Sequence, residues 1–293
     1  MKLLRYGPVG YEQPGLVDAQ GRVRDLSLHT TDITPAFLYE TCSASLHSIV
    51  PPLLPRVAGS PRLGVPIAGS PRVIAVEPNF PFDSGRSKAP CPGRPAMSMS
   101  ATGAAMGPYD DLDMPSGCMM MDCQVKLGVV IGRRASCVEA ANSLDYVFGY
   151  VVVHELSERL FQRKSWIGGH PSVQFGPVGP WLVSKDEVED VENLRIWLNV
   201  NGRRAYVGTT RAMFLGVAEL VRYVSQLVEL EPGDIITTSA EMASRAGQGL
   251  SIPLNGGDIV ELGIERLGAQ KHKVYSRRRR GMRERLGLSR RSR

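Results

Sequence analysis

The sequence predicts a mainly β protein with few helices. From residue 124 onward, short apolar runs recur between Gly, Pro, Asn and Asp residues, which is the pattern of strands joined by turns. These runs do not alternate with helical segments as βαβ units do, so a parallel doubly wound sheet is not expected. Only residues 212–230 form a long segment with apolar residues at helical spacing.

The first 71 residues read as a small N-terminal domain that ends in a linker. Short strands are expected within residues 2–7 and 14–27, around the turn Asp-Ala-Gln-Gly. A helix can form over residues 33–49. The stretch 50–72 is rich in Pro and Gly and is typical of a linker.

Residues 72–275 are expected to form the main domain. Residues 72–80 predict a strand, and residues 81–121 show no clear period, as in a binding loop, a lid or a disordered stretch. The firmer elements that follow are strands over 124–133 and 145–157, a short helix over 136–144, a helical turn over 157–163, a Pro/Gly-punctuated stretch over 175–183, a hairpin over 193–208 turned by Asn-Gly, the helix over 212–230, and turn-plus-strand units over 231–239 and 255–268.

Composition is that of a cytoplasmic globular protein. Five cysteines without a CxxC pair indicate reduced thiols and make a zinc site unlikely. The N-terminus lacks the apolar core of a signal peptide, and no apolar run reaches the length needed to span a membrane. A membrane partner is therefore not expected.

The positive charge is concentrated in residues 276–293, which we expect to be a disordered tail. This segment holds nine Arg and one Glu, a net charge of +8, so the rest of the chain carries +6 − 8 = −2. A basic tail can attract nucleic acid. It has no interleaved aromatic residues for base stacking, so a nucleic-acid partner is not favoured.

The strand "QVKLGVVIGR" carries two polar residues where a core strand should be apolar. Gln124 and Lys126 are two residues apart, which places both side chains on one face of the strand. An amide and an ammonium side by side before a buried run indicate a site rather than packing.

Several stretches together resemble the fumarylacetoacetate hydrolase family. They are "KLGVVIGR", "DYVFGYVVVHELSERLFQ", "FGPVGPWLV", the run from "LNVNGRRAYVG" to "GDIITTS", and "NGGDIVELGIERLG", in the family's order and spacing. The resemblance covers about residues 72–275 and more weakly residues 1–71. It implies a mixed β-sandwich roll with a small N-terminal β/α domain, and a homodimer.

The resemblance also implies a metal site that this sequence does not preserve. Family members cleave or decarboxylate 1,3-dicarbonyl or 2-oxo acid substrates with Mg²⁺ or Mn²⁺, which stabilises the enolate that forms. The family's Glu-x-Glu ligands fall on Gln124 and Lys126, and its Asp ligand falls on Glu155. An ammonium offers no lone pair and repels a cation, so we predict no metal and an ion pair between Lys126 and Glu155.

Other site positions of the family also differ here. Its catalytic His-x-x-Glu falls on Asp83 and Arg86, its Lys before the Glu-x-Glu strand on Ser100, the Lys of its W-x-x-G-K segment on His170 (with Trp166 kept), and its substrate-contacting Gln on Tyr206. The preceding Asn-Tyr pair is matched in part by Asn79 and Phe80. New titratable groups thus replace the lost ones.

This set predicts a repurposed, metal-independent enzyme that takes an enolisable 1,3-dicarbonyl or polyketide-type compound. A cyclase, isomerase or C–C lyase of natural-product biosynthesis would fit. Lys126 would stabilise an enolate oxygen, Glu155 or Asp83 would act as base, and His170 or Tyr206 as acid. The expected substrate-binding residues are Gln124, Tyr206, Trp166, Arg86 and Ser100.

Two alternatives stay open. One is a non-catalytic protein of the same fold that binds a ligand or partner, and the other is a Mg²⁺-dependent acylpyruvate-type hydrolase or decarboxylase. Seven methionines between residues 97 and 121 suit either a bulky apolar ligand or simple packing.

Overall fold

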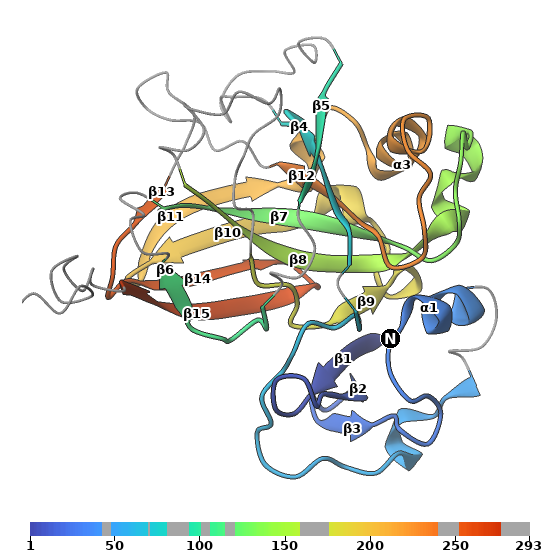
Figure 1. Ribbon diagram of the computed structural model, residues 1–293, viewed down its shortest axis with the longest axis vertical. Helices are drawn as coiled ribbons and strands as arrows, with labels where there is room; N and C mark the ends of the chain where they lie inside the picture. The colour runs from blue at the N-terminus through green and yellow to red at the C-terminus, as the bar shows by residue number, and fades with distance from the viewer. Residues whose placement is uncertain are drawn as a thin grey trace, which may run out of the picture.

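The computed structural model describes residues 1–42, 48–69, 71–80, 94–100, 106–114, 121–158, 176–239 and 252–276. Within these residues the chain forms two sheets (Figure 1). The large sheet has the order β3 (Val23–Asp25), β2 (Gln13–Val17), β1 (Lys2–Tyr6), β9 (Leu182–Ser184), β8 (Val147–Glu158), β7 (Met121–Ile131), β12 (Ile235–Ser239), β4 (Val73–Glu77), β5 (Ala96–Ser100), with β13 (Ile252–Leu254) also paired to β7.

The second sheet has five strands. Its order is β11 (Arg203–Thr209), β10 (Arg195–Val200), β14 (Ile259–Ile264), β15 (Gly268–Ser276) and β6 (Leu112–Met114). Strands β12 and β4 are parallel, as are β15 and β6, and the other pairs are antiparallel. The prediction of a mainly β fold with mixed strand directions is confirmed.

Helices are few and short in the described residues. They are α1 (Pro35–Thr41), α3 (Val217–Ser225) and the 3₁₀ segments η2 (Pro51–Leu53), η3 (Ala140–Tyr146), η4 (Lys185–Glu187), η5 (Val191–Asn193) and η6 (Thr210–Ala212). Helix α1 begins after Thr34, whose side chain accepts a hydrogen bond from the Phe37 amide. None of these helices combines the length and apolar character required to cross a membrane.

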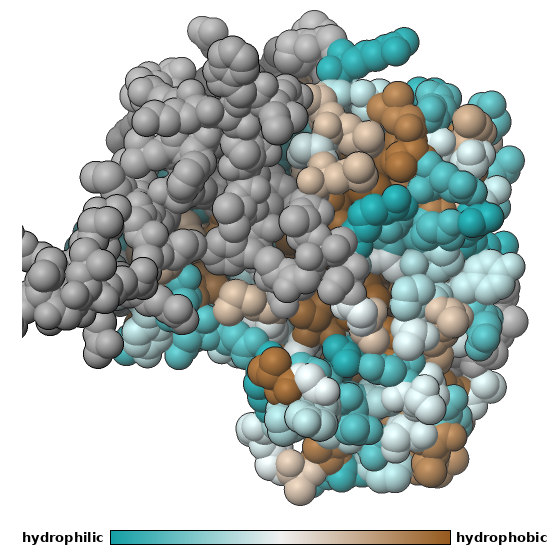
Figure 2. Space-filling model, in the orientation of Figure 1, coloured by the Kyte–Doolittle hydropathy of each residue, from teal (hydrophilic) through white to brown (hydrophobic). Residues whose placement is uncertain are grey.

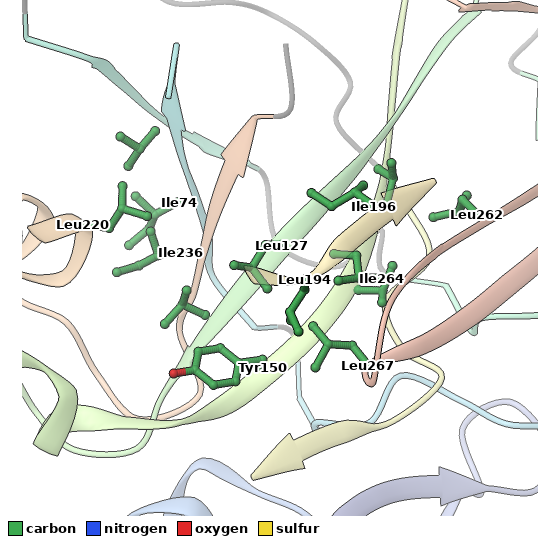
Figure 3. Close-up of a cluster of buried hydrophobic side chains, with 14 of the residues drawn as sticks. Ile74, Leu127, Tyr150, Leu194, Ile196, Leu220, Ile236, Leu262, Ile264 and Leu267 are labelled. Atoms are coloured by element: carbon green, nitrogen blue, oxygen red, sulfur yellow. The ribbon is translucent and has the colours of Figure 1, made fainter. Parts of the chain in front are cut away.

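The long antiparallel pair of β7 and β8 divides its side chains between two faces. Val125, Leu127 and Val129 point into the core between the two sheets. Figure 3 shows Leu127 of β7 in one cluster with Tyr150 of β8, Ile264 of β14 and Leu194, the residue before β10. Because side chains alternate along a strand, Gln124 and Lys126 point to the opposite face of the large sheet.

The N-terminal segment covers part of that opposite face. A second apolar cluster joins residues of this segment, such as Leu3, Leu38 and Ile67, to Val151 and Val153 of β8. Strand β1 also pairs with β9, so the N-terminal strands β1, β2 and β3 continue the large sheet. In Figure 2 this segment, at the bottom, shows hydrophilic and hydrophobic residues interspersed on its surface.

Residues 81–121 contain structure that the sequence pattern did not predict. Strands β5 and β6 lie within this stretch, and β5 pairs with β4 along its whole length. The Met-Ser alternation of β5 is a strand signal that a search for β-branched and aromatic residues misses. The short helix expected over 136–144 is the 3₁₀ helix η3, which spans Ala140–Tyr146, and α3 is shorter than residues 212–230.

Four of the five described methionines of this region pack into the protein. Met114 and Met121 are buried in the core between the sheets, and Met97 and Met106 pack against it. Met99 is exposed, and Met119 and Met120 lie outside the described residues. Of the two alternatives, these four residues follow packing.

Candidate functional site

Lys126 lies at the centre of a charged group on the large sheet. Residues Gln124 and Glu155 are directly opposite each other in the β7–β8 pair, and Lys126 is opposite Val153. This diagonal offset lets the lysine Nζ reach Oε2 of Glu155 at 2.5 Å. Lys126 is fully buried, and the Glu155 side chain is 11% exposed.

A second carboxylate, Glu77, completes the group from two strands away. Ser239 of β12 is opposite Lys126, and the parallel β12–β4 register places Glu77 at the end of β4 beside this row. The Lys126 Nζ donates a hydrogen bond to Oε1 of Glu77, whose side chain is 30% exposed. Glu77 was not among the residues predicted from the sequence, although an acidic residue at the end of an apolar strand could have pointed to it.

The two carboxylates keep Lys126 charged. Burial alone lowers the pKa of an ammonium, but the charges of Glu155 and Glu77 and their hydrogen bonds outweigh it and raise the pKa of Lys126 to about 12. With both carboxylates ionised, the group of Glu77, Lys126 and Glu155 has a net charge of −1. It is a buried cation under two partly exposed anions.

Asn79 fixes the end of β4 next to this group. Its side chain is fully buried, donates to the Leu215 carbonyl (3.0 Å) and Thr238 Oγ1 (2.8 Å), and accepts from the Leu215 amide (2.7 Å). These bonds tie β4 to β12 and to the chain leading into α3. Because Glu77 is two residues away, the same bonds hold its backbone in place.

Other polar atoms share the Lys126 face. The buried amide oxygen of Gln124 and the hydroxyl of Thr237 accept or donate no hydrogen bond within the described residues. Thr237 is opposite Gly128, one row along from Lys126. Asp122, which was not among the predicted site residues, is also buried on this face, two residues before Gln124.

His154 points away from the site. It lies opposite Val125, so it enters the core between the sheets, where its ring centroid is 5.1 Å from that of His272. It is fully buried, and neither ring nitrogen has a hydrogen-bond partner among the described residues. Burial, and next the neighbouring His272, lower the pKa of His154 well below 6.5.

Two of the other predicted site residues, Tyr206 and Ser100, lie away from this group. Tyr206, expected to bind substrate, is on β11 opposite Leu198 and packs against the core between the sheets, on the other side of the large sheet from Lys126. Burial raises the pKa of Tyr206 to about 12. Ser100 pairs with Val73, at the far end of β4 from Glu77. Asp83, Arg86, Trp166 and His170 lie outside the described residues.

The donor set does not fit a divalent metal ion. Mg²⁺ and Mn²⁺ take oxygen ligands, and here the space between the Glu77 and Glu155 carboxylates holds the Lys126 ammonium. Across the described parts of the chain, no three His, Cys, Asp or Glu side chains are grouped to hold a metal. The ammonium supplies the positive charge that a metal would otherwise bring.

Comparison with known proteins agrees with this fold. Residues 74–275 match the sequence model of the family described as "Fumarylacetoacetate (FAA) hydrolase C-terminal". A protein of Burkholderia multivorans named "Putative hydrolase" is 42% identical over 276 residues, which cover 92% of this chain and 97% of that one. A relative from Burkholderia cenocepacia with the same description is 42% identical over 274 residues, with the same coverage of both chains.

Solved structures show the same architecture at lower identity. Fumarylacetoacetate hydrolase from Exiguobacterium antarcticum is 23% identical with a TM-score of 0.80, over 94% of this chain and 100% of that one. Maleylpyruvate hydrolase from Sphingobium sp. SYK-6, solved with manganese(II) and pyruvate, is 21% identical with a TM-score of 0.77, over 94% of this chain and 99% of that one. The chain belongs to the fumarylacetoacetate hydrolase family.

Proposed function

We propose that this chain is a metal-independent enzyme that uses acid–base chemistry on an enolisable 1,3-dicarbonyl or polyketide-type compound. The observation that carries the proposal is the Lys126 Nζ held between the Glu77 and Glu155 carboxylates. The reactions that fit are ring closure and isomerisation, which begin by removing a proton next to a carbonyl group, and C–C bond cleavage, in which the broken bond leaves its electron pair as an enolate.

The geometry supports this chemistry in two ways. A partly exposed carboxylate can accept a proton from carbon, and a buried ammonium beneath it favours the negative charge that develops on the enolate oxygen. Because Lys126 has no exposed surface, it acts on the substrate through its charge and by holding the carboxylates. The fold relatives include hydrolases and an isomerase, so the fold accommodates more than one type of reaction.

A direct test is turnover without metal. A panel of 1,3-diketones, β-keto esters and acylpyruvates would be followed by loss of enol absorbance, with products identified by NMR and excess EDTA present. We expect conversion of at least one compound, unchanged by EDTA and lost in Lys126→Met. Conversion that needs added Mg²⁺ or Mn²⁺ would instead establish the hydrolase or decarboxylase alternative.

The non-catalytic alternative has its own signature in the same experiment. A protein that binds panel members, as seen by raised unfolding temperature, but converts none of them would be a ligand-binding relative of these enzymes. The orphaned Gln124 and Thr237 oxygens are compatible with a bound ligand in either case.

A further inference from the structure

Glu77 and Glu155 both contact Lys126, but they differ in surroundings. The Glu155 side chain is 11% exposed and lies in the middle of the sheet, directly opposite Gln124 on β7. The Glu77 side chain is 30% exposed and is the last residue of β4, a strand flanked by the short β5. The two carboxylates are therefore unequal in their access to a ligand.

We infer that Glu77 is the catalytic base of this site and that Glu155 is the fixed counter-ion of Lys126. This inference rests on the proposed metal-independent function and assigns its proton-transfer step to one residue. A base must come within hydrogen-bond reach of the proton that it removes, and the more exposed carboxylate satisfies this condition. The more enclosed carboxylate serves better to keep a buried ammonium neutralised throughout the reaction.

The step balances without any co-reactant. The C–H bond between or beside the carbonyl groups breaks, its proton forms an O–H bond on the Glu77 carboxylate, and the electron pair moves to the carbonyl oxygen as an enolate. The total charge stays at −1, because the charge lost from Glu77 appears on the substrate. Return of the proton to another atom gives isomerisation, and attack of the enolate carbon on a second carbonyl gives ring closure.

The position of Lys126 favours this charge movement. In the resting site the ammonium is shared by two carboxylates. Once Glu77 is protonated, Lys126 keeps Glu155 as its partner at 2.5 Å. The positive charge of Lys126 then also attracts the enolate oxygen that forms near Glu77. A site with Glu155 as base would instead leave the ammonium without its most enclosed counter-ion at that moment.

Asn79 is a positioning residue for Glu77. Its three side-chain hydrogen bonds lock the backbone two residues after Glu77 to β12 and to Leu215. A base held on a rigid strand end keeps its carboxylate in one place relative to the substrate.

The test compares Glu77→Gln, Glu77→Ala and Glu77→Asp on the 1,3-dicarbonyl compound that the wild-type protein converts fastest. We expect kcat to fall by about 100- to 10,000-fold in Glu77→Gln, as for loss of a general base. Glu77→Asp should retain part of the rate. Addition of acetate or formate should restore part of the rate to Glu77→Ala, because a small carboxylate can enter the space left by the side chain.

Glu261→Gln is the matched control. Glu261 is 33% exposed, close to the 30% of Glu77, and pairs with Lys271 at 2.9 Å on β14 and β15, away from the site, so we expect wild-type turnover. If the wild type converts the compound and Glu77→Gln keeps more than a tenth of kcat, the assignment of Glu77 as the base is overturned and the proposed function stands. The assignment also falls if a folded Glu77→Ala gains nothing from acetate or formate. Absence of any conversion by the wild type overturns the proposed function and, with it, the role of Glu77.

Discussion

Replacing Lys126 by methionine should destabilise the protein through charge, with little change in packed volume. Methionine is close to lysine in length and lacks the ammonium, so the aliphatic stem is largely conserved. The variant leaves Glu155 and Glu77 facing each other without the cation that now lies between them. Two uncompensated carboxylates near a buried position are costly.

The expected loss at pH 7 is about 3 to 5 kcal/mol, the range measured when one partner of a buried ion pair is removed. We expect the lower part of this range, because the Glu77 side chain is 30% exposed and partly solvated. For a chain of this size each kcal/mol corresponds to roughly 2–4 °C, so the unfolding temperature should fall by roughly 6–12 °C.

The pH dependence separates charge from packing. Protonation of either carboxylate at lower pH removes their repulsion, so the gap between variant and wild type should narrow as pH falls from 7 to about 4.5. In the wild type, the raised pKa of Lys126 means that its contribution is complete below the unfolded value of 10.5. It is lost only as pH rises through about 12.

Urea unfolding at pH 7 and at pH 4.5 measures both effects. Lys271→Met is the control, because the Lys271 side chain is 62% exposed and its pair with Glu261 should contribute less than about 1 kcal/mol. The reasoning is refuted if Lys126→Met loses no more than Lys271→Met at pH 7. It is also refuted if its loss is the same at both pH values, which would indicate packing alone.

Three other substitutions test separate parts of the structure. The pKa of His154 is lowered in the folded protein, so below pH 6.5 the unfolded chain binds more protons and the wild type loses stability as pH falls. His154→Leu should reduce this loss. Urea unfolding at pH 7 and at pH 5 measures the change in the free energy of unfolding for both proteins. An unchanged pH slope would contradict this. Asn79→Ala should cost about 1–3 kcal/mol by leaving the Leu215 amide without its acceptor, measured by the same unfolding assay. Gly149→Ala should prevent or severely weaken folding, because a Cβ there would lie 2.0 Å from the Val183 carbonyl oxygen; a soluble variant with wild-type circular dichroism would contradict the close packing of β8 and β9.

The framework of the fold could be predicted from the sequence because its signals are local. The apolar runs of β7 and β8 have the strand period, and the Asn201-Gly202 turn takes up the positive φ values that a tight hairpin needs. Strands β5 and β6 were missed, because their Met, Ser and Asp residues have weak strand propensity. Their pairing with β4 and β15 stabilises them instead.

Only the part of the candidate site that lies on the paired strands β7 and β8 could be predicted from the sequence. Gln124 and Lys126 share a face by the alternation of a strand, and the resemblance to the family placed Glu155 beside them. The contact of Glu77 with Lys126 could not be predicted, because β12 lies between their two strands and the order of strands in a sheet does not follow from local sequence. Tyr206 was expected at the site, yet the β10–β11 register directs its side chain into the core between the sheets.

The most direct test of the central idea, that Lys126 stands in the place of a metal ion, is Mn²⁺ binding followed by electron paramagnetic resonance of free Mn²⁺. The wild-type protein should leave Mn²⁺ free at concentrations up to about 1 mM, because the ammonium repels it. Gln124→Glu combined with Lys126→Glu should bind one equivalent, since three or more carboxylate side chains would then surround the position that Nζ now holds. A wild-type protein that binds one Mn²⁺ at micromolar concentration, and loses it in Glu155→Gln, would contradict the account.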